Sequence, residues 1–263
     1  MGLALHAEWT KFRTLASSWW LLLAVAALTI AVSAVAAAAF NCQPAGCTPQ
    51  QTGADPAKLS LTGADLGQVV IALLAAGAIG GEYGSGMIRL TLTAVPRRLT
   101  AFTAKALVTA TAALAAAALA VVGSALAGRL ILPGKGLSAA NGYLPVSLGN
   151  AADLRAAGGT VLYLALIALL ALGVTTAVRD AGGGIGIVLG ILFLLPIASA
   201  VIPDHVLSRH LEQIAPMTAG LYIQATVGVQ SLPLTPWQGL GVTAAWAAAA
   251  LIVGAGVLRL RDA

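Results

Sequence analysis

Residues 204–212 contain four side chains of the types that bind metal ions, in the string DHVLSRHLE. His205 and His210 are five positions apart, a spacing that does not place two side chains on one face of a helix, and the string contains no H-E-x-x-H motif. Asp204 and Glu212 flank the histidines. We therefore predict no metal site and interpret these residues as the polar ends of a short helix.

Two cysteines, Cys42 and Cys47, lie in the string NCQPAGC. Pro44 and Gly46 favour a turn between them. If this segment faces an oxidising compartment, the two thiols can form a disulfide that closes a small loop. The alternative is a pair of free thiols. A zinc site is not expected, because no histidine or carboxylate lies close by in the sequence.

The sequence lacks the G-x-x-x-x-G-K-[ST] motif that binds nucleotide phosphates. The nearest string, Gly134-Lys135-Gly136, has no following Ser or Thr. No Ser–His set or paired carboxylates lie within an apolar run, as an intramembrane enzyme would require. We expect a non-catalytic chain with no cofactor of its own, so any ATP hydrolysis would come from a separate polypeptide.

Composition places the chain in a membrane. Of its 263 residues, 59% are hydrophobic and only 9% are charged, whereas soluble domains have about 25% charged residues. The mean hydropathy is +0.92. The net charge of +5 does not indicate nucleic-acid binding, because the basic residues lie at the ends of apolar runs.

Six apolar runs are long enough, or nearly so, to cross a bilayer as helices, which takes about 20 residues each. None shows the alternation of a barrel strand. No loop is large enough to be a separate domain. The predicted fold is all-α, a single membrane domain over residues 1–263 with spans at about 19–40, 66–81, 106–132, 158–178, 183–202 and 239–258.

Six spans place both termini on one side of the membrane. Nine of the fourteen Lys and Arg residues fall on that side. Because basic residues concentrate in cytoplasmic segments, we expect both termini in the cytoplasm and a multi-pass protein of a bacterial cytoplasmic membrane.

The residues before the first span predict an interfacial amphipathic helix. Leu5, Trp9, Phe12 and Ala16 fall at helical spacing on one face, an arrangement that allows a helix to lie in the headgroup layer. The alternative is a simple basic flank that sets topology.

The segment between the second and third spans, residues 82–105, has apolar residues among polar neighbours. Met87, Ile88 and Val95 must be buried in the lipid interface or in a partner protein. Both interpretations stay open from the residues alone.

Gly182, Gly186 and Gly190 recur at a spacing that lets membrane helices approach closely. They could serve packing within the chain or between two copies, and we expect packing within the chain. No charged residue lies at the middle of a span. This argues against an ion-driven carrier, which usually needs one there.

Three strings together resemble the type-2 (export) permease family of ABC transporters, in the form common in actinobacteria. They are EWTKFR with SWW near the start, EYGSGMIRLTLTAVPRR before the third span, and LTPW with RLRDA at the end. The resemblance implies a second permease copy, an ABC ATP-binding subunit and export. It assigns ATPase coupling to the interfacial helix, through Trp9, Lys11, Phe12 and Arg13, and to the loop, through Glu82, Tyr83, Arg89, Val95, Pro96, Arg97 and Arg98.

The main alternative is a membrane anchor or sensor that docks a cytoplasmic partner without transport. A coupling loop and a docking loop look alike in sequence. Neither interpretation identifies a substrate.

Overall fold

The computed structural model describes residues 2–14, 16–41, 48, 52–88, 98–147 and 149–260. Within these residues the secondary structure is helical and no strand occurs. Six helices are long and apolar enough to cross a membrane, and a short helix precedes the first of them. The predicted fold class, a multi-pass membrane protein with six spanning helices, is therefore confirmed.

The helices agree with the predicted spans in number and order but are longer at several ends. The third is the clearest case, because it begins at Arg98 rather than near 106 and has 34 residues. At 1.5 Å per residue it is about 50 Å long, well beyond a hydrocarbon core of about 30 Å. The main helices are α1 (Gly2–Thr14), α2 (Ala16–Ala39), α4 (Pro56–Ser60), α5 (Ala64–Gly84), α7 (Arg98–Ile131), α8 (Ala151–Val178), α9 (Ala181–Val201), α10 (His205–Ile214), α11 (Pro216–Leu221) and α12 (Pro236–Leu260).

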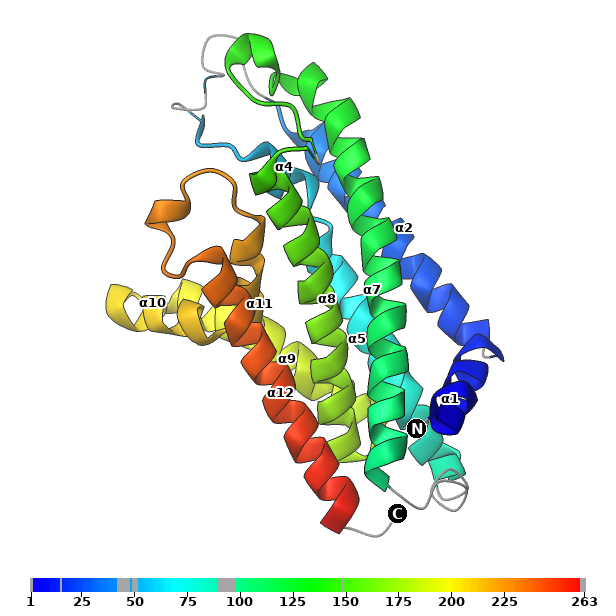
Figure 1. Cartoon of the computed structure of the whole chain (residues 1–263). Coiled ribbons are helices and arrows are strands. Elements are labelled where there is room, and N and C mark those ends of the chain that lie inside the picture. The colour runs from blue at the N-terminus through cyan, green and yellow to red at the C-terminus, as the bar shows by residue number, and fades with distance from the viewer. Residues whose placement is uncertain are drawn as a thin grey trace.

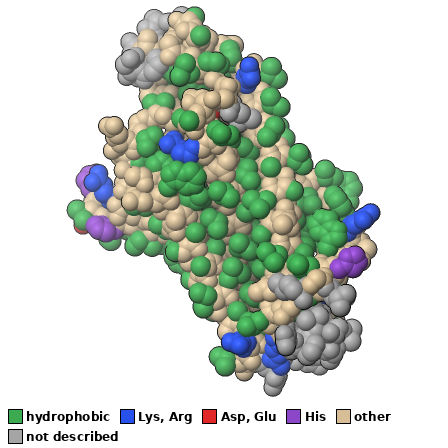
Figure 2. All heavy atoms as spheres, viewed as in Figure 1, with side chains coloured by type: hydrophobic (Ala, Val, Ile, Leu, Met, Phe, Trp, Pro, Cys, Tyr) green, Lys and Arg blue, Asp and Glu red, His purple; other side chains and the backbone are tan. Residues whose placement is uncertain are grey.

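The central helix of the bundle is α8, which packs against α5, α7, α9 and α12. Its side chains at Tyr163, Leu164, Ile167 and Leu170 are completely buried. Both termini lie at one end of the bundle (Figure 1), which we call the terminal end, and the opposite end is the distal end. In Figure 2, hydrophobic side chains cover the middle of the visible face, whereas Lys and Arg side chains lie toward the two ends and on α10.

Small residues allow α8 and α12 to pack with their backbones in contact. A Cβ atom added to Gly173 would lie 2.5 Å from the carbonyl carbon of Ala250, and one added to Gly254 would lie 2.7 Å from the carbonyl oxygen of Gly173. Only hydrogen fits in these spaces. Glycine is thus required on both sides of this contact, as is common between membrane helices.

The expected packing of Gly182, Gly186 and Gly190 within the chain is wrong for the described residues. A Cβ atom on Gly186 would meet nothing within 4 Å, and those on Gly182 and Gly190 would meet only side chains close by in sequence. Gly184 of α9 does pack inward, against Thr175. The spacing of the three glycines places them on one face of α9, but that face points away from the bundle.

At the distal end, Asp55 joins two segments that are far apart in the sequence. Its carboxylate accepts hydrogen bonds from the Thr226 hydroxyl (2.7 Å) and the backbone N–H groups of Thr226 and Val227 (3.0 Å for Val227). The same carboxylate caps α4 through the N–H of Lys58 (3.1 Å). A single side chain therefore fixes the loop after α11 onto the start of α4.

We expect Asp55→Asn to destabilise the distal end by about 1 kcal/mol, because an amide replaces charge-assisted hydrogen bonds with neutral ones. Limited proteolysis of the purified protein would show faster cleavage near residues 225–235. A matched control is Asp204→Asn, whose carboxylate caps only the exposed helix α10 through Val206 (2.8 Å). Equal protease sensitivity of the two variants would contradict a linking role for Asp55.

The string with the two histidines forms α10, a short helix on the distal side of α9. His205 and His210 are both exposed on it. The predicted short helix with polar ends is thus confirmed. Cys42 and Cys47 lie outside the described residues, so their pairing stays a prediction.

Candidate functional site

Four charged side chains from three helices meet at the terminal end. Glu8 and Lys11 come from α1, Glu82 from the last turn of α5, and Lys105 from the second turn of α7. Figure 1 shows α1 lying beside the terminal ends of α5 and α7. We call these four residues the ionic cluster. It joins the N-terminal helix to the two spans on either side of residues 85–97.

Lys105 occupies the centre of the ionic cluster. Its ammonium group lies 2.5 Å from Oε2 of Glu8 and 2.9 Å from Oε1 of Glu82. A third hydrogen bond goes to the backbone carbonyl of Ala78, at 3.3 Å. Because a lysine ammonium has three N–H donors, all three have an acceptor here.

Lys11 is the second cation of the cluster and lies nearer its surface. Its Nζ is 3.1 Å from Oε1 of Glu8 and 3.0 Å from Oε1 of Glu82. Burial alone would lower the pKa of Lys11, but the hydrogen bond that Lys11 donates to Glu82 and the charges of Glu8 and Glu82 outweigh it and raise the pKa above its ordinary value. Lys11 therefore keeps its charge throughout the physiological range.

Three of the four side chains in the cluster are almost closed to solvent. Glu8, Glu82 and Lys105 are only 6–7% exposed. Charges taken out of water in this way must be paired, and removing one partner of a buried pair typically costs about 3–5 kcal/mol. One acceptor stays unused, because Oε2 of Glu82 is buried and no described residue donates to it. The cluster is thus electrically balanced but has spare acceptor capacity.

A cavity of about 630 Å³ lies against the ionic cluster, bounded by α1, the start of α2, α5 and α7. All four charged residues line it at one end. The remaining wall is mostly apolar and includes Phe12, Leu21, Leu74 and Val108. The cavity is in the volume range of small-molecule sites, about 300–1,000 Å³. It has one charged end and one apolar end.

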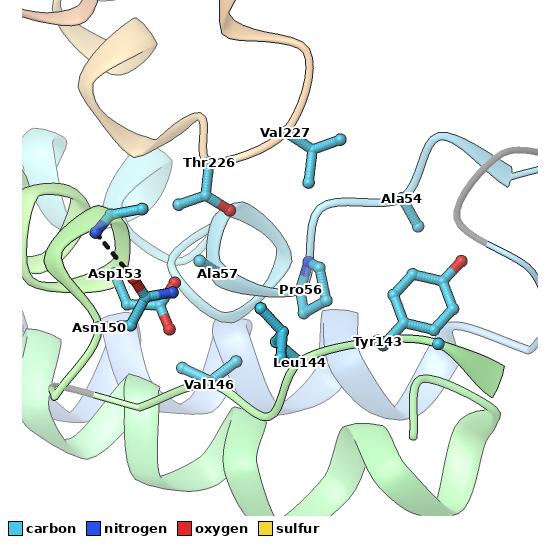
Figure 3. A pocket seen from close by; sticks show the side chains of 12 residues that line it. Ala54, Pro56, Ala57, Tyr143, Leu144, Val146, Asn150, Asp153, Thr226 and Val227 are labelled. Carbon is cyan, nitrogen blue, oxygen red and sulfur yellow. Dashed lines mark hydrogen bonds between the residues drawn. The ribbon is translucent and has the colours of Figure 1, made fainter. Parts of the chain in front are cut away.

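A second, smaller cavity of about 200 Å³ lies at the distal end (Figure 3), between the segments around Ala54, Tyr143 and Thr226. Its polar side chains already serve the local fold. Asn150 caps α8 through the N–H of Ala152 (3.2 Å), the dashed line in Figure 3, and Asp153 accepts from the N–H of Ser147 (2.9 Å). We therefore take the cavity at the terminal end as the candidate functional site.

Of the residues predicted on the N-terminal helix, Lys11 and Phe12 are in the site. Trp9 is 47% exposed and stacks on Phe12 with ring centroids 6.4 Å apart. Arg13 is exposed, and its carbonyl accepts a hydrogen bond from Trp19 (3.0 Å). The predicted single apolar face is wrong in part, because Phe12 packs inward against α5 and α7, while Trp9 lies on the outside.

Of the residues predicted in the loop, Glu82 is in the ionic cluster, and Tyr83 packs beside it against Ile79 and Phe102. Arg98 lies elsewhere, because its guanidinium donates to the carbonyl of Leu258 at the end of α12 (3.1 Å). This bond positions the start of α7 against the C-terminus of α12. The other four predicted loop residues lie outside the described residues, namely Arg89, Val95, Pro96 and Arg97.

Sequence reasoning missed Glu8 and Lys105 as site residues. Each is a charged side chain next to an apolar stretch, and such residues are read by default as membrane-boundary charges. The available signal was charge balance. Opposite charges occur on the N-terminal helix, at Glu8 and Lys11, and at the ends of the second and third spans, at Glu82 and Lys105. The predicted topology places all of these segments on the same side of the membrane. That signal predicts that the four side chains lie near one another, but not which ion pairs they form.

Comparison with known proteins adds no relative. No protein-family model matches the chain, and no curated protein matches it significantly.

Proposed function

We propose that this chain is the membrane-spanning subunit of an ABC exporter of the type-2 permease kind, coupled to a separate cytoplasmic ATPase. In this proposal it is a non-catalytic transport subunit. Two copies, or this chain and a related one, pair in a bacterial cytoplasmic membrane with all termini in the cytoplasm. The resemblance of the three sequence strings to that family is one support.

The observation that carries the proposal is the ionic cluster. An ATPase that acts on a permease must move helices by pushing on segments outside the membrane. Here residues 85–97 run from the end of α5 to the start of α7, and the cluster ties both helices to α1. A force applied to this segment would therefore move α1, α5 and α7 together.

The open face of α9 supports pairing with a second copy. Among the described residues, a Cβ atom added to Gly186 or Gly190 would meet no atom of another helix within 4 Å, and close helix contact across small residues is a common way for membrane helices to associate. Lipid would cover this face in a single chain.

The test is co-expression with ABC ATPase subunits of the same organism, starting with any encoded beside this chain. The complex would be purified in detergent and its ATPase rate measured in liposomes. A stable complex whose rate depends on this chain supports the permease. Stable partner binding with no effect on ATPase rate would favour an anchor or sensor, and well-folded protein that binds no ATPase would overturn the proposal.

We expect Arg97→Glu to weaken ATPase binding at least about tenfold, since it reverses a charge in the predicted docking segment. Membrane insertion and thermal stability should not change. Arg98→Glu serves as a contrast, because loss of its bond to Leu258 should lower the melting temperature as well. Co-purification yield and melting curves separate the two effects. Normal ATPase binding by Arg97→Glu would remove this residue from the docking segment.

A further inference from the structure

The cavity beside the ionic cluster combines charged and apolar side chains, and the proposed coupling to an ATPase does not require it. We propose that it binds amphipathic molecules with a primary ammonium group and an apolar body. This inference does not depend on the proposed transport function, because it concerns a site that this chain forms by itself.

The hydrogen-bond donors and acceptors of the ionic cluster favour a ligand with a cationic head group. Lys105 has three acceptors for its three N–H donors and has none left for a ligand. Glu82 is the opposite case, since its Oε2 accepts no hydrogen bond from any described residue. Glu82 lines the cavity, so a hydrogen-bond donor that enters the cavity lies next to this carboxylate. An ammonium group can donate a charge-assisted hydrogen bond to it, whereas an ionised carboxylate head has no proton to donate.

Two of the five hydroxyl-bearing residues in the wall add acceptors as well. Thr14 donates its proton to the carbonyls of Thr10 (3.0 Å) and Lys11 (3.1 Å), and Ser85 donates to the carbonyl of Gly81 (2.7 Å). With their protons already used by the backbone, these hydroxyls offer only lone pairs. The polar part of the wall therefore accepts hydrogen bonds at several points.

The rest of the wall selects an apolar body. Phe12, Leu74 and Val108 are each less than a tenth exposed and pack together behind the cavity, with Leu21 beside them. A cavity of about 630 Å³ suits a ring system or a short alkyl chain. A small hydrophilic amine would leave this surface in contact with water and gain little from it.

Dansylcadaverine is a suitable probe, because it carries a primary amine, a five-carbon linker and an apolar fluorophore. Trp9 on α1 and Trp19 and Trp20 at the start of α2 can transfer excitation energy to it. The protein would be titrated in phosphatidylcholine nanodiscs with three probes of similar size. These are dansylcadaverine, the neutral N-pentyl dansylamide, and a dansyl aminohexanoate with a carboxylate in place of the amine.

The structure offers a blocking variant with a matched control. Gly77 lines the cavity, and a Cβ atom added there meets nothing within 4 Å, so Gly77→Leu would place an apolar side chain in the space. Gly241 on α12 has equally open surroundings but does not line the cavity, so Gly241→Leu makes the same change in a membrane helix elsewhere. A third variant, Glu82→Gln, removes the proposed charge.

We expect saturable binding of dansylcadaverine that is at least about tenfold tighter than that of either other probe. Gly77→Leu should abolish it and Gly241→Leu should leave it unchanged, while Glu82→Gln should weaken it about tenfold or more. Equal binding of the amine and the neutral probe, preference for the carboxylate, or full binding by Gly77→Leu would each overturn the proposal. Since no ATPase is present, failure here leaves the permease proposal standing.

The ligand could be a free amine or the ethanolamine headgroup of a lipid. Repeating the titration in nanodiscs that contain phosphatidylethanolamine distinguishes these sources. Competition by the lipid supports a headgroup occupant, and undiminished binding supports a free amine.

Discussion

Lys105→Met is expected to destabilise the protein by about 3–5 kcal/mol, the usual cost of removing one partner from a buried ionic group. The change leaves Glu8 and Glu82, both almost completely buried, with Lys11 as the one remaining cation of the cluster. Met has nearly the volume of Lys without its charge, so the effect isolates electrostatics from packing. Thermal unfolding and chemical denaturation in detergent would measure it.

A second substitution tests the cause. In Lys105→Met with Glu8→Gln, the charges of the cluster are balanced again, because one carboxylate, Glu82, and one cation, Lys11, remain. We expect the double variant to be more stable than Lys105→Met alone, because it removes the uncompensated buried charge. Lys135→Met is the control, since Lys135 is at the distal end and makes one long contact, 3.4 Å to Asn41. A loss no greater than that of Lys135→Met would refute the buried cluster.

Gly173→Ala is expected to destabilise the protein by at least about 2 kcal/mol, in the upper part of the range for overpacking. The added methyl group would lie 2.5 Å from the carbonyl carbon of Ala250 and 2.6 Å from the amide nitrogen of Leu251. Both are backbone atoms of α12, so no side chain can rotate away. The two helices must move apart, which also separates the packed residues around them.

Gly158 supplies the control on the same helix. A Cβ atom there meets nothing within 4 Å, so Gly158→Ala makes the same chemical change in open space. Its effect should be neutral or slightly stabilising, because alanine has the higher helix propensity. Melting curves of the two variants side by side provide the measurement. Similar stabilities would show that α8 and α12 are not in backbone contact.

The tight α8–α12 contact and the open α9 face illustrate how far glycine patterns predict packing. The spacing of Gly182, Gly186 and Gly190 indicates a smooth helix face but not its direction. Direction depends on which neighbour fills the space beside the helix. In this chain α8 packs against the face of α9 that carries Gly184, and the regular stripe is left outside.

The ends of the helices show a similar limit. Apolar runs predict the part of a helix that lies in lipid, because that part must be apolar. They do not predict polar turns beyond it, and α7 continues seven residues on the N-terminal side of Lys105. Lys105 therefore lies within the helix, where it pairs with Glu8 of α1.

The sequence by itself determined the membrane class, the six spans, the short N-terminal helix and the placement of both termini on one side. These follow from composition and run length, which are local properties that lipid enforces on any chain. The tertiary structure alone decided that Glu8 meets Lys105, 97 positions away, and that a cavity opens beside them. Such pairings depend on the position of α1 against α5 and α7. That position is set by the packing of the whole bundle.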